Sequence, residues 1–234
     1  MTDSSPPAPP AAGRVSIIIP ILDEAACLRE NLPHLQIFRQ QGHEVIVVDG
    51  GSRDGSQDQA AGLVDKYLHS APGRARQMNL GAAQAVGEWL WFLHIDTRVP
   101  RDAVRAILEA GQRHHWGRFD VTLQPSTPLL RIVAGMMNLR SRLTGIATGD
   151  QGIFVSRRAF ADVDGFPSIA LMEDVEMSRR LKRLGPPACL RRQVRTSSRR
   201  WHSKGCLRTI LLMWWLRLAY FLGVGPERLA RWYR

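Results

Sequence analysis

Gly87-Glu-Trp-Leu-Trp-Phe-Leu-His-Ile-Asp96 is the stretch that decides the fold, because an apolar strand in it runs directly into two polar side chains. The apolar part is typical of a strand that is buried on both faces of a parallel sheet. His94 and Asp96 follow where that strand ends. Ligands of open parallel sheets bind at the carboxyl ends of the strands, so the stretch predicts an α/β fold with a binding site at this edge.

Three similar units precede this stretch. The β-branched segment 15–19 leads to Asp23 and Glu24, and the apolar segment 44–48 leads to a loop of turn-forming residues at 49–56. Apolar residues at helical spacing follow the first of these loops, and a third unit spans about 63–86. This alternation predicts one α/β domain with a mostly parallel central sheet and helices on both faces.

The remaining elements follow from apolar spacing and from turn-forming residues. The expected helices are 28–38, with Pro33 disturbing its first turns, and 101–111, 129–143, 172–184 and 207–223. The expected strands are 118–124 and a short one within 149–155. The chain is therefore divided into a disordered tail at 1–13, the α/β domain at 14–206 and a basic, apolar, amphipathic helical segment at 207–234.

Composition narrows the class of protein. The chain has 234 residues, of which 44% are hydrophobic and 23% charged, which suits one globular domain and excludes collagen-like, mucin-like and fully disordered chains. Cys27, Cys189 and Cys206 are far apart and form no CxxC pair, which argues against a disulfide framework or a zinc site and favours a reducing cytoplasm. The N-terminus lacks the basic start and the apolar run of a signal peptide.

Four sets of polar residues are expected at strand ends, where they either form turns or bind a ligand. They are Asp23 with Glu24, the loop 49–54, His94 with Asp96, and Asp150 with Gln151. His94 and Asp96 lie two residues apart on an extended segment and face the same way, so they can share one cation. The alternative is that His94 is a structural residue beside Trp91 and Phe92.

Met172-Glu-Asp-Val-Glu-Met177 opens a predicted helix with three carboxylates. These charges either complement the helix dipole or include a general base that faces the cleft. The candidates for that base are Glu173 and Asp174.

Taken together, four stretches resemble the motif series of family 2 glycosyltransferases with the GT-A fold, in the same order and spacing. They are 17–24 (IIIPILDE), 47–54 (VVDGGSRD), 87–96 (GEWLWFLHID) and 171–174 (LMED). Segments 73–79 (GRARQMN) and 197–201 (SSRRW) add a resemblance to the bacterial subgroup of radical-SAM/selenodomain-associated transferases. The resemblance extends from residue 15 to the C-terminus.

The resemblance implies a single Rossmann-like GT-A domain that binds a nucleotide-diphosphate sugar and a divalent cation, Mn²⁺ or Mg²⁺. Pro20 and Glu24 would line the nucleotide pocket, and Asp49 would contact the base or the ribose. Asp96 corresponds to the last acid of the DxD motif, which holds the cation on the donor diphosphate. The donor-binding set implied by the resemblance is Pro20, Glu24, Asp49, Arg74, Asn79, Asp96, Arg200 and Trp201.

Asp174 takes the position of the catalytic base in that family, but the chain departs from the family pattern elsewhere. Gly50 replaces the second Asp of the nucleotide motif, His94 replaces the first Asp of DxD, and Ser197 replaces the Gln of QxxRW. The metal candidates are therefore Asp96 and His94, and the identity of the metal stays open.

Glycosyl transfer needs a cation or a guanidinium at the departing diphosphate and a base at the attacking acceptor. Asp96 with a metal, helped by Arg74 or Arg200, would supply the first, and Asp174 the second. A single in-line displacement of this kind inverts the anomeric centre. The rival interpretation is a non-catalytic nucleotide-sugar or polyanion-binding domain that keeps the fold.

The net charge of +11 is concentrated near the C-terminus, since segment 178–226 has twelve Arg and Lys residues and no Asp or Glu. The apolar run 209–224 has 16 residues and contains Arg217, so it is too short to span a membrane. It is either an interfacial helix on an anionic membrane surface or a helix packed on the domain, and nucleic acid is a weaker alternative because no binding motif is present. The expected location is the cytoplasm, with peripheral contact to the inner face of the cell membrane and a lipid-linked acceptor as one alternative.

Overall fold

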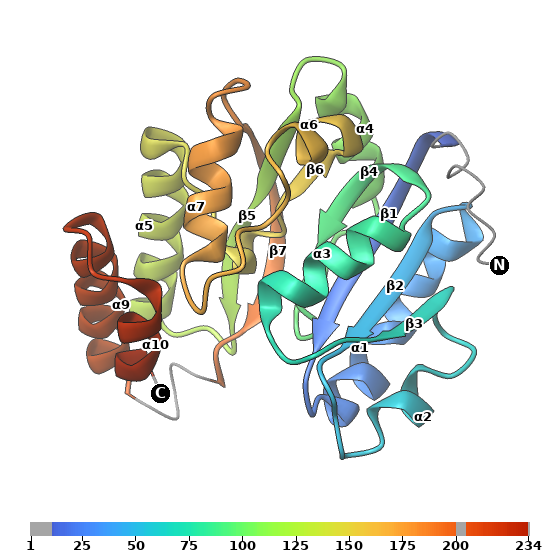
Figure 1. Ribbon diagram of the computed structural model, residues 1–234, viewed down its shortest axis with the longest axis horizontal. Coiled ribbons are helices and arrows are strands. Elements are labelled where there is room, and N and C mark those ends of the chain that lie inside the picture. The colour runs from blue at the N-terminus through green and yellow to red at the C-terminus, as the bar shows by residue number, and fades with distance from the viewer. Residues whose placement is uncertain (1–10, 200–204, 234) are drawn as a thin grey trace, which may run out of the picture.

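Seven strands form one sheet in the order β3-β2-β1-β4-β6-β5-β7. The computed structural model describes residues 11–199 and 205–233. Only β6 runs antiparallel to its neighbours, which are β4 and β5, so the predicted mostly parallel sheet is confirmed (Figure 1). The strands are β1 Ala11–Ile21, β2 Glu44–Asp49, β3 Lys66–His69, β4 Gly87–Phe92, β5 Trp116–Gln124, β6 Phe154–Ser156 and β7 Ala188–Ser197.

Helices cover both faces of this sheet, as expected (Figure 1). The α-helices are α1 Ala25–Gln40, α2 Ser56–Ala60, α3 Arg74–Gln84, α4 Ala103–Gly111, α5 Pro128–Thr144, α6 Arg157–Asp162, α7 Glu173–Leu181, α9 Cys206–Phe221 and α10 Pro226–Tyr233. A short 3₁₀ turn, η1, spans Gly149–Gln151.

Two cores lie on the two faces, because successive side chains of a strand point to opposite sides. Ile17 and Ile19 of β1 pack with Leu28 of α1 in one core, which also contains residues of α4. Ile18 packs with Met78 of α3 in the other core, together with residues of α6 and α7. All three isoleucines are fully buried.

The N-terminal half differs from the expectation in two details. The segment 1–10 of the predicted tail lies outside the described residues, but β1 already begins at Ala11, where it pairs with Gly87. The backbone N–H of Gly13 donates to Glu88 Oε2 at 3.0 Å, which holds this segment on β4. Pro33 lies inside α1 without ending it, because the buried apolar face of that helix keeps it on the sheet.

The strand β7 was missed by the sequence analysis, which treated its residues only as a basic stretch. Val194 and Thr196 are buried, whereas Arg191, Gln193 and Arg195 are exposed. This alternation with a period of two is the signal of a half-buried strand, and the density of arginine obscured it.

The C-terminal segment forms two helices, and it packs on the domain. Leu216 and Ala219 of α9 are buried against Met172 and against Leu229 of α10. Figure 1 shows both helices at one end of the molecule, beside α5 and α7. Within the two described ranges, no helix has the length and apolar character needed to cross a bilayer.

Candidate active site

The loops after β1 and β2 meet at the carboxyl edge of the sheet, where the sequence analysis expected a site. The backbone N–H of Asp23 donates to Ser52 Oγ at 2.8 Å, and that of Arg53 donates to Asp23 Oδ1 at 2.8 Å. The backbone N–H of Ala25 donates to Asp54 Oδ2 at 2.8 Å. These bonds join the two loops into one rim, on which Glu24 is the N-cap residue of α1.

Asp49 ends β2 and holds its loop in place. One carboxylate oxygen accepts hydrogen bonds from the backbone of Gly51 and from both the backbone and the hydroxyl of Ser52, at 3.1, 2.9 and 2.5 Å. The other accepts from the Tyr67 hydroxyl at 3.0 Å. Burial alone would raise the pKa of Asp49, but these hydrogen bonds outweigh it and lower the pKa. Its predicted contact with a nucleotide stays a prediction.

Arg199 lies among the predicted donor-binding residues, although the sequence analysis treated it only as part of the basic stretch. Its Nη2 atom is 3.7 Å from Glu24 Oε2 and 3.7 Å from Asp96 Oδ2, and it donates to Cys27 Sγ at 3.0 Å. This guanidinium follows the last strand β7 and reaches back to the loops after β1 and β4. Arg199 is therefore a further candidate, in addition to Arg74 and Arg200, for the guanidinium that neutralises the donor diphosphate.

The carboxylate of Asp96 is crowded by other acids. Burial raises its pKa, and the nearby charges of Asp150 and Glu24 raise it further, whereas His94 and Arg199 lower it. An excess of carboxylates at one place is where a cation binds favourably.

His94 contacts the later loop through Asp150, and its predicted role as a metal ligand with Asp96 stays a prediction. Its Nδ1 atom is 3.3 Å from Asp150 Oδ1, and a Cβ atom on Gly149 would come within 2.8 Å of its Nε2 atom. Across the described ranges, no three His, Cys, Asp or Glu side chains are grouped to hold a metal ion. A Mg²⁺ or Mn²⁺ ion commonly uses one or two carboxylates and completes its shell with substrate phosphates and water, and Asp96 beside Asp150 fits that pattern.

Asp174 is oriented by the backbone at the start of α7. Its Oδ2 atom accepts from the backbone N–H of Gly149 at 2.9 Å, and its Oδ1 atom accepts from that of Val175 at 2.7 Å. The preceding Met172 has φ 71°, in the left-handed region, and so turns the chain sharply into the helix. Two fixed donors hold this carboxylate in one orientation.

Glu173 is more deeply buried than Asp174 and lies next to a cation. Burial raises its pKa, the charge of Asp174 raises it further, and Arg74 opposes both. The Nη1 atom of Arg74 is 3.8 Å from Glu173 Oε1. Arg74 thus lies beside the predicted catalytic pair, as well as near the donor edge.

Two cavities meet at these residues. The smaller one is lined by Pro20, Arg74, His94, Glu173 and Asp174, among others, so it brings together predicted residues from β1, α3, the loop after β4 and α7. The larger one has a volume of about 500 Å³ and also reaches Asp174. Its far side is apolar and is built from α5 and α9, and its lining includes Leu129, Ile132, Val133, Met136, Met137, Ile210, Met213 and Trp214.

Three predicted residues are placed differently or lie outside the described part. The side chain of Asn79 exchanges two hydrogen bonds with the backbone of Phe166, at 2.8 and 2.9 Å, so it holds that loop and its amide is already used. Arg200 and Trp201 lie outside the described residues. Arg140 and Arg217, which also line the larger cavity, were missed because each lies on a helix far along the chain from the strand-end motifs.

The comparisons with known proteins agree with this geometry. Residues 16–125, which contain the motifs after β1, β2 and β4, match the family model described as glycosyl transferase family 2. Over these 110 residues, just under half of its length, the chain is similar to family 2 glycosyltransferases. The search of curated proteins found no match. The narrower resemblance to the radical-SAM/selenodomain-associated subgroup stays a prediction.

The fold of the chain recurs in solved structures. PcManGT, a mannosyltransferase from Pyrobaculum calidifontis in complex with GDP-Man and Mn²⁺, matches with a TM-score of 0.67 and 19% identity, over 97% of this chain and 71% of that one. TarS from S. aureus matches with a TM-score of 0.62 and 16% identity, over 79% of this chain and 36% of that one. TarS 1–349 in complex with UDP-GlcNAc matches with a TM-score of 0.61 and 17% identity, over 80% of this chain and 59% of that one. The chain therefore spans about a third of TarS.

Proposed function

We propose that the chain is a glycosyltransferase that moves a sugar from a nucleotide-diphosphate donor to an acceptor in the larger cavity. The family match and the fold support a transferase with a nucleotide-sugar donor. The observation that carries the mechanism is the placement of Asp174, which two backbone N–H groups orient at a cavity separate from the Asp96 and Arg199 pair. One side of the site can therefore hold the diphosphate while the other receives the attacking hydroxyl.

On the donor side, the chain supplies Glu24, Asp96 and Arg199. Asp96, with Asp150 beside it, is the carboxylate that would hold a divalent cation, and the diphosphate would supply further oxygen ligands. When bound, the cation neutralises the charge that develops on the departing diphosphate. Arg199 is close enough to Asp96 to neutralise the same group.

On the acceptor side, Asp174 is the general base. As the acceptor oxygen bonds to the anomeric carbon, the bond from that carbon to the β-phosphate oxygen breaks and the nucleoside diphosphate leaves with its electron pair. Asp174 takes the proton of the acceptor hydroxyl in the same step. Because this is a single displacement from the face opposite the leaving group, the product has the inverted configuration.

Titration calorimetry tests the donor side. We expect UDP or GDP to bind the protein more tightly with Mn²⁺ than with EDTA, and Asp96→Ala to remove that difference. A nucleotide affinity that is the same with Mn²⁺ and with EDTA would contradict the role of Asp96 as a metal ligand. A screen of nucleotide sugars for released nucleoside diphosphate then separates an enzyme from a binding domain, since the rival domain would bind nucleotide and release none.

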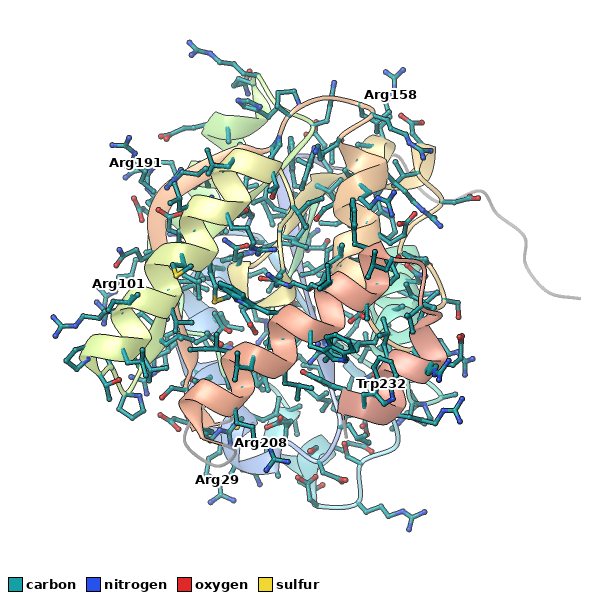
Figure 2. The ribbon with its side chains drawn as sticks, turned by 90° about the vertical axis from the view of Figure 1, so that its left-hand side faces the viewer. Arg29, Arg101, Arg158, Arg191, Arg208 and Trp232 are labelled. Atoms are coloured by element: carbon teal, nitrogen blue, oxygen red, sulfur yellow. The ribbon has the colours of Figure 1, made fainter. Side chains whose placement is uncertain are left out.

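The same proposal places the acceptor at a membrane surface in the cytoplasm. Several side chains of α9 and the residue that follows it are apolar and exposed, with Trp214 60%, Phe221 85% and Leu222 72% accessible. Ile132 and Leu143 of α5 are also exposed, and Figure 2 shows α5 and α9 on the same side of the molecule. Two apolar helices that flank the cavity suit a bilayer surface.

The basic residues support this contact less than the sequence suggested. Arg192 is 2.7 Å from Asp102, and Arg199 lies in the donor site. Figure 2 places Arg191 and Arg208 far apart. The arginines therefore do not form one patch around α9, and apolar insertion is the stronger part of the proposed membrane contact.

A further inference from the structure

Two arginine side chains line the larger cavity, and neither has a carboxylate partner in the part of the chain that the structure describes. Arg140 comes from the middle of α5 and Arg217 from α9. Throughout the described ranges, neither guanidinium is within ion-pair distance of an acid, and three nitrogens, Nε and Nη2 of Arg140 and Nε of Arg217, are buried without a hydrogen-bond partner. Buried nitrogen atoms without a hydrogen-bond partner are costly, so a hydrogen-bond acceptor at this place would stabilise both side chains.

The two guanidiniums are close enough to affect each other and Asp174. Burial lowers the pKa of Arg140 to about 10, the positive charge of Arg217 lowers it too, and Asp174 opposes these effects. Burial likewise lowers the pKa of Arg217, with Asp174 and Asp150 opposing it. Arg140 still carries its charge at neutral pH, and an anion between the two side chains would relieve their repulsion.

The unpaired atoms also indicate the shape of that anion. Nε and Nη2 form the side edge of a guanidinium, which donates two parallel hydrogen bonds to one oxyanion. On Arg140 both atoms of this edge lack partners, and on Arg217 one does. A carboxylate has only two oxygens, and the edge of a single guanidinium already binds both of them. A phosphate has three free oxygens and can accept from both side chains at once.

The rest of the cavity suits a hydrocarbon chain. Ile132 and Met136 of α5 lie on one side, and Met213 and Trp214 of α9 on the other. The cavity volume of about 500 Å³ is within the usual range for small-molecule sites. Ile132, Met136 and Trp214 line the cavity and are also exposed, so the apolar lining continues onto the surface of the two helices.

We propose that Arg140 and Arg217 form an anion-binding subsite for the acceptor, and that the acceptor is an amphiphile with a phosphate group on an apolar chain. This inference rests on the proposed function, because it identifies the occupant of the cavity that Asp174 faces. The phosphate anchors the acceptor between the two guanidiniums, the chain lies along α5 and α9, and a hydroxyl near the phosphate reaches Asp174.

Octyl phosphate, octanol and inorganic phosphate are the probes that test this subsite by titration calorimetry. The wild-type protein should bind octyl phosphate at least tenfold more tightly than either of the other two. Arg140→Gln and Arg217→Gln should each lower the affinity for octyl phosphate at least tenfold, with less than twofold change for octanol. Arg131→Gln on α5 and Arg208→Gln on α9 are exposed matched controls and should leave all three affinities unchanged.

Stability and nucleotide binding complete the test. The two Gln variants should melt at the wild-type temperature or above it, because each removes an unpaired buried charge. Arg217→Lys keeps the charge and should retain part of the affinity, which provides a second variant if Arg217→Gln does not fold. Binding of UDP or GDP with Mn²⁺ should be the same in all variants.

Three results would overturn the inference while leaving the proposed function in place. They are equal affinities of the wild type for octyl phosphate and octanol, equal affinities for octyl phosphate and inorganic phosphate, and Gln variants that bind octyl phosphate as the wild type does. Loss of nucleotide affinity in the Gln variants would instead assign the arginines to the donor diphosphate, which also overturns it. A wild type that binds no nucleotide would contradict the proposed function itself.

Discussion

Asp174 is the residue on which the proposed chemistry depends most directly. Asp174→Asn keeps the shape of the side chain and removes its basicity, so we expect turnover to fall by about 10² to 10⁴ while nucleotide affinity stays nearly constant. Release of nucleoside diphosphate at saturating donor measures the first quantity, and calorimetry measures the second. Glu176→Gln, on the same helix, is the control and should retain activity. Full activity in Asp174→Asn would move the base elsewhere.

Glu173 gives a prediction for stability against pH. Its pKa in the folded protein is raised, so the folded state binds the proton more tightly than the unfolded state does, and the ionised form costs stability at neutral pH. We therefore expect Glu173→Gln to raise the melting temperature at pH 7. The gain should shrink as the pH falls through the raised pKa of the folded state and vanish well below the ordinary value of 4.5, where Glu173 is neutral in both states.

Glu176→Gln is the control for that experiment as well. Glu176 is 3.4 Å from Arg180 Nε and 3.6 Å from Arg179 Nη1, so removal of its charge should bring no gain in melting temperature. A lower melting temperature for Glu173→Gln at pH 7 would show that the ion pair with Arg74 outweighs the cost of burial.

Site residues that lie close to a strand end or a helix start could be predicted from the sequence, and those that lie farther away could not. Asp96 and Asp174 could be predicted because short side chains at strand ends and helix starts are placed by the backbone alone. Arg199 and Arg217 could not, because a long side chain reaches a site that lies several elements away in the sequence. The contact of Asn79 could not be predicted for a related reason, since its amide bonds to the backbone of Phe166, 87 residues further on, and its role in donor binding stays a prediction.

At the scale of single elements, α9 has two apolar sides with different roles. Leu216 is fully buried, whereas Leu218, two residues later, is 52% exposed. Leu216→Ala should lower the free energy of unfolding by about 2 to 5 kcal/mol, and Leu218→Ala by less than about 0.5 kcal/mol. Urea unfolding of the two variants measures both. Equal effects would mean that α9 is not packed on the domain through Leu216.

The strands and helices also differ in how well sequence patterns alone predict them. The buried strands β1, β2 and β4 consist almost wholly of apolar residues, so composition alone identifies them. In β7, arginines occupy the exposed positions, and the strand is recognisable only from the alternation of buried and exposed residues. The packing of α9 was left open because its sequence is apolar around most of its circumference, so the sequence does not distinguish the side on the domain from the side that remains exposed.

At the scale of the whole molecule, the exposed side of α9 predicts how the protein binds membranes. Because the contact is mainly apolar, flotation with anionic vesicles should persist in 1 M salt, where the Debye length is about 3 Å. Phe221→Ser with Leu222→Ser should abolish flotation. Val86→Ser, an exposed apolar residue before β4, is the control and should have no effect. Binding that disappears at high salt would point to the arginines instead, and no binding at low salt would contradict the membrane proposal.

The position of β6 has a consequence for the order in which the protein folds. This strand of three residues lies between β4 and β5, although both precede it in the chain, and β5 has β7 as its other neighbour. β1 to β4 can assemble with their helices on their own, whereas β5 joins them only through residues 154–156, which lie later in the chain. We expect refolding to protect the amide hydrogens of β1, β2 and β4 before those of β5 and β7, and pulse-labelled hydrogen exchange would record that sequence of events.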